Sequence, residues 1–301
     1  MTFLAEHFVT PPHWEWYILG YFFLAGISGG AYALGSMLRL WGSPRDEEAA
    51  RIAFLVSFPA LVLCPILLTV DLGQPLRFWH MMVDTGPATF GQLNLKAWSP
   101  MSLGVWGLLV FGIFSAVNFL EALAVSGRRY PLSEVVVSTL RGGFGTGWMI
   151  VGTVLALFIA AYTGVLLSVS NQPVWSDTWA LGGLFLASGL SGAAACVVLF
   201  LRGRAAGSAS KLAEADAYFV ILEVVLLAVF LLTVAIAGTV GRLFWPIGVV
   251  LWLIVLLGLA LPLAGHYKVG GLQRISPLAT AVVVLLGVLA LRAAVIFGPQ
   301  T

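Results

Sequence analysis

The sequence has little charge. Asp, Glu, Lys and Arg make up only 9% of its 301 residues, while 60% of the residues are hydrophobic and the mean hydropathy is +1.01. A soluble domain carries about a quarter charged residues. This composition therefore excludes an ordinary soluble domain and predicts a polytopic membrane protein. The net charge of +2 is too small to indicate a nucleic-acid partner.

Cysteine and histidine are also scarce. Cys64 and Cys196 lie in apolar runs and are too few to hold an iron–sulfur cluster, which needs four thiolates. The four histidines all lie at the ends of apolar runs or between them: His7, His13, His80 and His266. A haem ligated by two histidines inside the membrane is therefore not expected, and neither a metal-ligand cluster nor a nucleotide-binding loop is present in the sequence. If the chain handles electrons, a partner must bring the carrier.

Apolar runs of about 20 residues occur eight times, which is the length that crosses a bilayer. They cover about 15–40, 52–72, 98–122, 147–170, 179–201, 217–238, 244–264 and 277–297. The N-terminus lacks a basic segment and leads directly into the first run, so we expect no cleavable signal. An even number of spans places both termini on one side. Residues 202–216 are expected to form a solvated linker.

Lysine and arginine are distributed unevenly between the two sides. Of the 15 basic residues, the side that holds the termini carries four, namely Arg77, Lys96, Arg242 and Arg292. The remaining 15 − 4 = 11 lie on the other side, which is therefore expected to be cytoplasmic. The termini and the polar stretch from Asp71 to Trp98 would then face outward from a bacterial inner membrane. Arg292 is expected to snorkel, and tryptophans such as Trp175 to form an outward aromatic belt.

An internal repeat is visible in the spans. Phe23–Ala31 reads FLAGISGGA, and Phe185–Ala194 reads FLASGLSGAA. The sequence LLTV ends the second span at Val70 and recurs at Val234. Both pairs run in the same direction, which indicates a parallel repeat, although chance similarity among small and aliphatic residues is the alternative.

The apolar runs predict an all-α integral membrane fold of eight transmembrane helices, and the repeat divides these helices into two four-helix bundles. The bundles would cover about 15–170 and 179–297 within a single membrane domain, 1–301. Only the first copy of LLTV is followed by a charged residue, Asp71, and the second is followed by Ala235.

Polar residues gather at the outward ends of the first four spans: His13, Asp71, Arg77, His80 and Tyr162. A quinone head group needs a hydrogen-bond donor for each carbonyl and a nearby proton exchanger, which tyrosine, histidine and aspartate supply. Each residue alone also has a structural interpretation, as a core tyrosine, an interfacial histidine or a lipid-phosphate contact. Their convergence favours a quinone site, with Asp71 also able to transfer protons.

Glu223 lies about two turns inside the sixth span. Carboxylates within the membrane are costly and are usually functional. Glu223 is therefore either a proton-transfer step from the cytoplasm or a structural group bonded to a neighbouring hydroxyl. The sequence leaves both interpretations open.

Several motifs together resemble the NrfD/PsrC family of polysulfide reductase-type membrane subunits. They are DLGQPLRFWH at 71–80, WSPMS at 98–102, YTGVLLS at 162–168 and LFLASGLSG at 184–192. Gln74 stands where the family usually has a basic residue. The resemblance implies a haem-free membrane anchor that binds menaquinone or ubiquinone near the outer face, with His13 and Tyr162 at the quinone.

The resemblance also implies two partners. One is a ferredoxin-like subunit with four iron–sulfur clusters, and the other is a molybdopterin catalytic subunit, so that these cofactors reside only in the partners. Residues Asp84 to Lys96 are the expected docking face. The alternatives are a multi-pass transporter with a site between the two repeats and a purely structural anchor.

Overall fold

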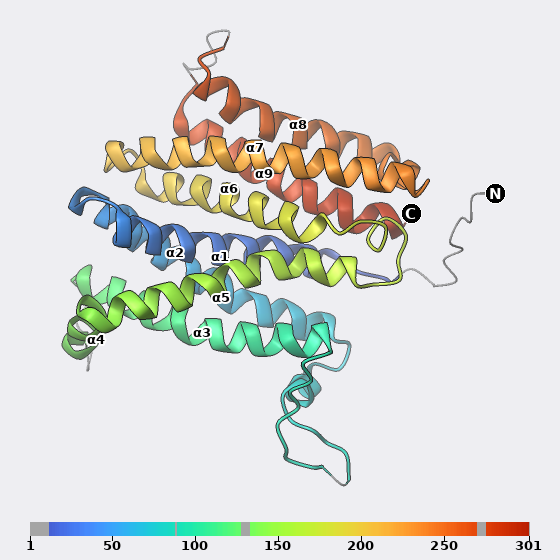
Figure 1. Ribbon diagram of the computed structural model, residues 1–301, viewed down its shortest axis with the longest axis horizontal. Coiled ribbons are helices and arrows are strands. Elements are labelled where there is room, and N and C mark those ends of the chain that lie inside the picture. Colours follow the sequence, from blue (N-terminus) through green and yellow to red (C-terminus); the bar gives the residue numbers. More distant parts are fainter. Residues whose placement is uncertain (1–11, 88, 128–132, 270–274, 301) are drawn as a thin grey trace.

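The computed structural model describes residues 12–87, 89–127, 133–269 and 275–300 (Figure 1). Eight of its helices are long and apolar enough to cross a membrane, which confirms the predicted number. Their bounds are α1 (Trp16–Trp41), α2 (Glu47–Asp71), α3 (Pro100–Val125), α5 (Gly143–Ser168), α6 (Leu181–Leu201), α7 (Ala206–Ile236), α8 (Pro246–His266) and α9 (Pro277–Phe297). A short helix that the sequence did not predict, α4 (Ser133–Arg141), precedes α5.

Serine followed by proline begins two of the spans. The Ser99 hydroxyl accepts a hydrogen bond from the Ser102 amide, and Pro100 is the first residue of α3. Ser276 caps α9 in the same way, ahead of Pro277. A serine cap satisfies an amide that would otherwise lack a partner, and proline is favoured at the first helical position because it has no amide hydrogen.

The spans form two groups of four that meet along α1 and α6 (Figure 1). In the first group the contacting pairs are α1 with α2, α2 with α3, α3 with α5 and α5 with α1. In the second group they are α6 with α7, α7 with α8, α8 with α9 and α9 with α6. The order of neighbours is therefore the same in both groups.

Glycines allow α1 and α6 to approach closely. A Cβ atom placed on Gly189 would lie 3.1 Å from the Cα atom of Gly26, and one placed on Gly30 would lie 2.6 Å from the carbonyl oxygen of Gly189. Small residues at such crossings bring helix backbones into direct contact, which is how helices associate in lipid. The glycine-rich segments of α1 and α6 thus form the contact between the two groups.

Both described ends of the chain lie at one end of the helices, which we call the terminal end (Figure 1). The Trp14 amide donates a hydrogen bond to the Gln300 Oε1 atom at 2.9 Å. The same end carries the 3₁₀ helix η2 (Pro75–Met81) and the projecting segment formed by 82–87 and 89–99. The opposite end carries α4.

Two expectations about local structure were wrong. Residues 206–216 are the first turns of α7 rather than a solvated linker, because alanine, lysine, leucine and glutamate favour helix and Leu212 packs in a buried cluster. Trp175 is fully buried rather than part of an aromatic belt. Its indole nitrogen donates to the Val295 carbonyl at 2.7 Å, and its ring stacks on Trp14 at a centroid distance of 4.9 Å.

Candidate functional site

A pocket of about 410 Å³ lies at the terminal end, between η2, the end of α2 and the start of α3. We call it the η2 pocket. It is lined by Leu72, Gln74, Arg77, His80, Met81, Asn94, Lys96, Ser99, Met101 and Ser102. Two of the five predicted site residues, Arg77 and His80, therefore share one cavity.

A chain of hydrogen bonds holds the wall of this pocket in place. The Asn94 side-chain amide donates to the His80 carbonyl at 3.2 Å. The Asn94 carbonyl accepts from the Ser102 hydroxyl at 3.1 Å and from the Trp106 indole at 3.3 Å. The Ser102 hydroxyl also accepts from the Lys96 amide at 3.0 Å. The segment with Asn94 and Lys96 is thereby fixed against both η2 and α3.

The η2 pocket has basic side chains and no acidic ones. Arg77, His80 and Lys96 line it, and no aspartate or glutamate does. None of the three forms an ion pair with another residue that the structure describes. Asp84, which does not line the pocket, interacts electrostatically with Lys96, but its carboxylate already accepts a hydrogen bond from the Gly86 amide at 2.9 Å. The pocket is therefore suited to a ligand that accepts hydrogen bonds or carries negative charge.

Tyr162 borders the pocket without lining it. Its ring is buried against Gly104, and its hydroxyl donates to the Pro100 carbonyl at 2.6 Å. Pro100 lies between two lining residues, Ser99 and Met101. The hydroxyl proton of Tyr162 is thus engaged, and Tyr162 must change partner if it is to donate to a ligand.

Asp71 and His13 occupy different positions at the same end. Asp71 is the last residue of α2, directly before the lining residue Leu72. Its carboxyl lies near that of Glu15, and the two like charges repel each other. His13 is exposed just before α1 and makes no hydrogen bond or ion pair with another candidate residue in the described part of the chain. The structure therefore places four of the five predicted residues in or beside the η2 pocket and leaves His13 at the surface.

Arg292 does not snorkel, contrary to expectation. It is fully buried where α1, α6 and α9 meet. Its guanidinium group donates to the carbonyls of Phe22 and Phe185, each at 3.2 Å, and to the Ser188 hydroxyl at 2.8 Å. Because these acceptors surround the guanidinium within the protein, the side chain has no need to reach the membrane surface.

Glu223 is buried on α7, and its polar neighbours lie on three helices. It interacts electrostatically with Arg292 of α9 and hydrogen-bonds to Ser188 of α6. Asp216, the next acidic neighbour, lies seven residues earlier, two turns away on the same face of α7. Glu223 therefore has both a buried countercharge and a hydroxyl partner. These contacts are compatible with a proton-transfer step and with a structural group bonded to a hydroxyl.

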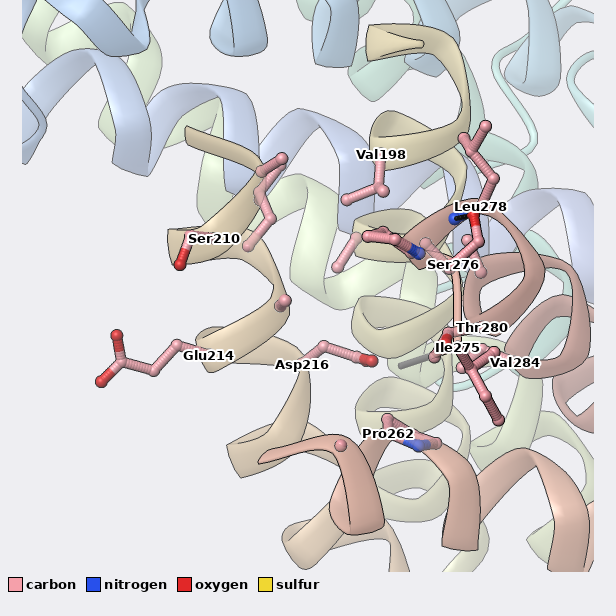
Figure 2. Close-up of a pocket in the computed structure, with 18 of the residues that line it drawn as sticks. Val198, Ser210, Glu214, Asp216, Pro262, Ile275, Ser276, Leu278, Thr280 and Val284 are labelled. Atoms are coloured by element: carbon pink, nitrogen blue, oxygen red, sulfur yellow. Dashed lines mark hydrogen bonds between the residues drawn. The ribbon is translucent and has the colours of Figure 1, made fainter. Parts of the chain in front are cut away.

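A larger pocket of about 760 Å³ lies at the opposite end, among α6, α7, α8 and α9. Figure 2 shows Asp216 pointing into this cavity. The Asp216 Oδ1 atom has no hydrogen-bond partner in the described part of the protein. This pocket lies within the second group of helices and contains none of the predicted quinone residues.

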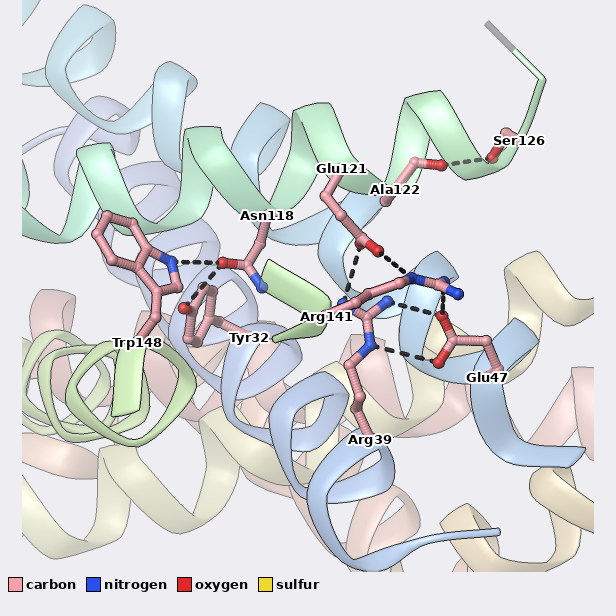
Figure 3. Close-up of polar contacts among 9 residues, drawn as sticks. All are labelled: Tyr32, Arg39, Glu47, Asn118, Glu121, Ala122, Ser126, Arg141 and Trp148. Carbon is pink, nitrogen blue, oxygen red and sulfur yellow. Dashed lines mark hydrogen bonds and ion pairs between the residues drawn. The ribbon is translucent and has the colours of Figure 1, made fainter. Parts of the chain in front are cut away.

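A closed ring of ion pairs joins α1, α2, α3 and α4 at the opposite end (Figure 3). Arg39 bonds to both Glu47 and Glu121 at 2.9 Å. Arg141 bonds to Glu47 at 2.9 Å and to Glu121 at 3.2 Å. Two cations and two anions alternate around this ring, so its charge is balanced and it links four helices.

The sequence did not indicate that Asn94 and Ser102 hold the wall of the η2 pocket. It predicted Lys96 as part of a docking face. The WSPMS motif pointed toward Ser102, but it did not show that the Ser102 hydroxyl holds Lys96. The bonds from Ser102 and Trp106 to Asn94 connect residues up to 12 positions apart. Only the folded loop brings them together.

The fold defines a multi-pass helical membrane protein with a basic pocket at one end. The family described as "Polysulphide reductase, NrfD" matches residues 5–301. The C chain of polysulfide reductase from Wolinella succinogenes is 30% identical, over 96% of this chain and 94% of its own length. The chain belongs to the NrfD family.

Two further relatives are similar over shorter regions. Protein NrfD of Escherichia coli is 30% identical, over 62% of this chain and 58% of its own length. The C subunit of selenate reductase from Mesobacillus selenatarsenatis is 30% identical, over 25% of this chain and 17% of its own length. The family resemblance inferred from the motifs is therefore confirmed.

Proposed function

We propose that this chain is the quinone-reactive membrane subunit of a bacterial respiratory oxidoreductase. The observation that carries the proposal is the η2 pocket, which unites Arg77 and His80 in a chain of the NrfD family. Its volume of about 410 Å³ lies in the range of small-molecule sites. Leu72, Met81 and Met101 provide apolar contacts for a quinone ring, and the basic side chains provide donors for its carbonyls.

Each predicted residue has a part in this proposal. Arg77 and His80 bind the head group of menaquinone or ubiquinone from within the pocket. Tyr162 donates to it after releasing the Pro100 carbonyl, and His13 holds it from the start of α1. Asp71 exchanges protons at the border of the pocket.

Glu223 supports proton transfer at a distance from the pocket. Asp216 points into the cavity at the opposite end, and Glu223 follows it two turns further along α7. Ser188 and Arg292 then continue the polar contacts toward α1. Because these groups succeed one another from the cavity inward, we assign Glu223 a proton-transfer role.

The names of two relatives and an exposed loop support the proposed partners. Polysulfide reductase and selenate reductase are the complexes whose subunits resemble this chain. We assign it a ferredoxin-like iron–sulfur partner with four clusters and a molybdopterin catalytic partner, and no haem of its own. The docking face is the projecting segment 84–96, where Phe90 and Leu93 are each 72% exposed. Exposed apolar side chains of this kind mark protein contacts.

We also assign the topology that the basic residues predicted. The terminal end faces the periplasm and the opposite end the cytoplasm. The two groups of helices are bundles related by a parallel repeat, which the equal order of neighbours in each group supports. The direct backbone contact between α1 and α6 argues against the alternative of a transporter with its site between the bundles.

The complex purified from its native membrane tests the proposal. Co-purification of iron–sulfur and molybdopterin subunits with bound quinone is expected, and a preparation without an iron–sulfur subunit would refute the assigned function. The double variant His13→Ala with Tyr162→Phe should lose most of the quinone-linked turnover.

A matched control uses Tyr218, which is exposed on α7 far from the η2 pocket. Tyr218→Phe should keep normal turnover. If the double variant also turns over quinone normally, with an unchanged apparent affinity, then His13 and Tyr162 are not site residues even though the chain remains a member of the family.

A further inference from the structure

The backbone of Lys96 is fixed beside the η2 pocket, which its exposed side chain helps to line, although Lys96 lies at the end of the segment assigned to docking. Its amide is bonded to the Ser102 hydroxyl at 3.0 Å, and Ser102 belongs to the first turn of α3. Its neighbour Asn94 is bonded to the His80 carbonyl of η2. The backbone at Lys96 is therefore tied to the same two elements that form the pocket.

Two of the lining residues place positive charge at one cavity. Arg77 comes from η2 and Lys96 from the segment before α3, the His80 imidazole lies with them, and no carboxylate lines the cavity beside them. Within the described part of the chain, neither Arg77 nor Lys96 forms an ion pair. Asp84 interacts with Lys96 from outside, but its carboxylate is bonded to the Gly86 amide and the Thr89 hydroxyl. Such a pocket is arranged to favour negative charge on its ligand.

Quinone reduction passes through a negatively charged form. A neutral quinone that takes one electron from the iron–sulfur carrier of a partner becomes a radical anion, with the charge on its two ring oxygens. A second electron and two protons then complete the quinol. Cations that face a ring oxygen stabilise the anion more than the neutral quinone, which makes the first electron transfer more favourable.

We propose that Lys96 is a further quinone-site residue, and that it makes the η2 pocket prefer the anionic form of the ligand over the neutral form. This inference rests on the proposed quinone function and deepens it. It also gives Lys96 a role different from partner docking. Ser102 acts as a positioning residue for Lys96, because its hydroxyl accepts the hydrogen bond from the Lys96 amide.

A pair of ligands that differ mainly in charge tests this preference. The probes are a hydroxynaphthoquinone whose hydroxyl is ionised at neutral pH and its uncharged methyl ether, titrated into the purified full-length chain. The wild type should bind the anion more tightly than the ether. Because a basic residue near a membrane surface contributes about a factor of five to anion binding, Lys96→Gln should reduce the anion-to-ether affinity ratio about fivefold.

Three other variants separate charge from structure. Lys96→Arg should keep the preference, because it keeps the charge. Ser102→Ala should reduce it by less than Lys96→Gln does. Arg242→Gln is the matched control, because Arg242 is an exposed basic residue outside the η2 pocket, on η3 (Val240–Leu243). It should leave the ratio unchanged.

A second measurement follows the radical directly in the intact complex. At a fixed potential, the electron paramagnetic resonance signal of the quinone radical should be smaller in Lys96→Gln than in the wild type and in Arg242→Gln. An equal signal in all three forms would contradict the inference.

The outcomes distinguish this inference from the proposed function. If neither probe binds and the native complex contains no quinone, the quinone function itself fails. If both probes bind the wild type equally well, or if Lys96→Gln keeps the wild-type ratio, the quinone function stands and the role of Lys96 is refuted. A Lys96→Gln variant that loses the iron–sulfur subunit but keeps the affinity ratio would assign Lys96 to docking and overturn the inference.

Discussion

Arg292 of α9 donates a hydrogen bond from its Nε atom to the Phe22 carbonyl of α1 at 3.2 Å, across 270 residues of sequence. The same guanidinium group bonds to the Phe185 carbonyl and the Ser188 hydroxyl of α6. It also lies over the Phe185 ring, 5.1 Å from the ring centroid. One buried cation thus joins the first helix to two helices of the second group.

Replacing Arg292 is expected to destabilise the whole fold. Arg292→Met leaves the Ser188 hydroxyl without its donor and leaves Glu223 without its countercharge. Removing one partner of a buried charge network costs about 3–5 kcal/mol, which denaturant unfolding in detergent micelles would measure. Arg242→Gln, at an exposed arginine, should change the unfolding free energy by less than about 0.5 kcal/mol. Adding Glu223→Gln to Arg292→Met should cost less than the sum of the single effects, and strict additivity would show that the two residues are not coupled.

The contact between α1 and α6 should not accept a larger residue at Gly30. A Cβ atom there would lie 2.6 Å from the Gly189 carbonyl oxygen and 2.7 Å from the Ala193 Cβ atom. Gly30→Ala must therefore move backbone, and overpacking of this kind costs about 1–3 kcal/mol. Gly147 of α5 is the control, because nothing lies within 4 Å of an added Cβ atom.

Gly147→Ala should stabilise the protein by up to about 1 kcal/mol through its helix propensity. Thermal unfolding of both variants in the same detergent gives the comparison. A Gly30→Ala protein as stable as Gly147→Ala would show that the two helices do not pack backbone to backbone.

Within the ion-pair ring of Figure 3, replacing the buried Glu121 should reduce the stability of the protein more than replacing the exposed Arg141. The Glu121 side chain is fully buried between Arg39 and Arg141, whereas the Arg141 side chain is 49% exposed. Glu121→Gln leaves two arginines facing an uncharged group, and the expected loss is about 3 kcal/mol. Arg141→Gln should cost less than about 1 kcal/mol, because water already screens that side chain. Similar losses in denaturant unfolding for both variants would contradict this ranking.

The loop before α3 should become less ordered in acid. Hydrogen bonds from the Gly86 amide and the Thr89 hydroxyl, helped by Lys96, hold the pKa of Asp84 below its ordinary value. A carboxyl whose pKa is lower in the folded state stabilises that state fully above the unfolded pKa of about 3.9 and loses this effect as the pH falls through the folded value. Amide exchange in residues 84–87 and 89–92, corrected for its intrinsic pH dependence, should therefore accelerate in that acidic range.

Asp84→Ala should accelerate the same amides at neutral pH, where the wild type is protected. Glu214→Ala, at an exposed carboxylate of the opposite end, is the control and should leave them unchanged. Protection in Asp84→Ala equal to that of the wild type would show that the carboxylate does not order the loop.

The number of spans and the family were both predictable from local sequence. A span needs only about 20 consecutive apolar residues, and lipid requires their backbone bonds to close within the helix, so eight apolar runs give eight helices. The motifs around Asp71 and Tyr162 are short and contiguous, and the family match confirms what they indicated. Helix beginnings were less predictable, because charged and hydroxyl residues interrupt the apolar pattern in 206–216, and the burial of Leu212 shows that this segment packs as part of α7.

The composition of the η2 pocket depended on tertiary structure. Arg77 and His80 are one turn apart, and their proximity follows from spacing alone. Lys96 joins them because the Ser102 hydroxyl and the Asn94 side chain fold the intervening loop back onto η2, a set of hydrogen bonds that no local pattern encodes. The position of Arg292 also depended on tertiary structure. A basic residue near a helix end is expected to snorkel, but carbonyls from distant helices surround Arg292 and keep it buried. The sequence by itself determined the number of membrane-spanning helices and the family. The tertiary structure decided which polar groups face each other, because those contacts join helices and loops that are distant along the chain.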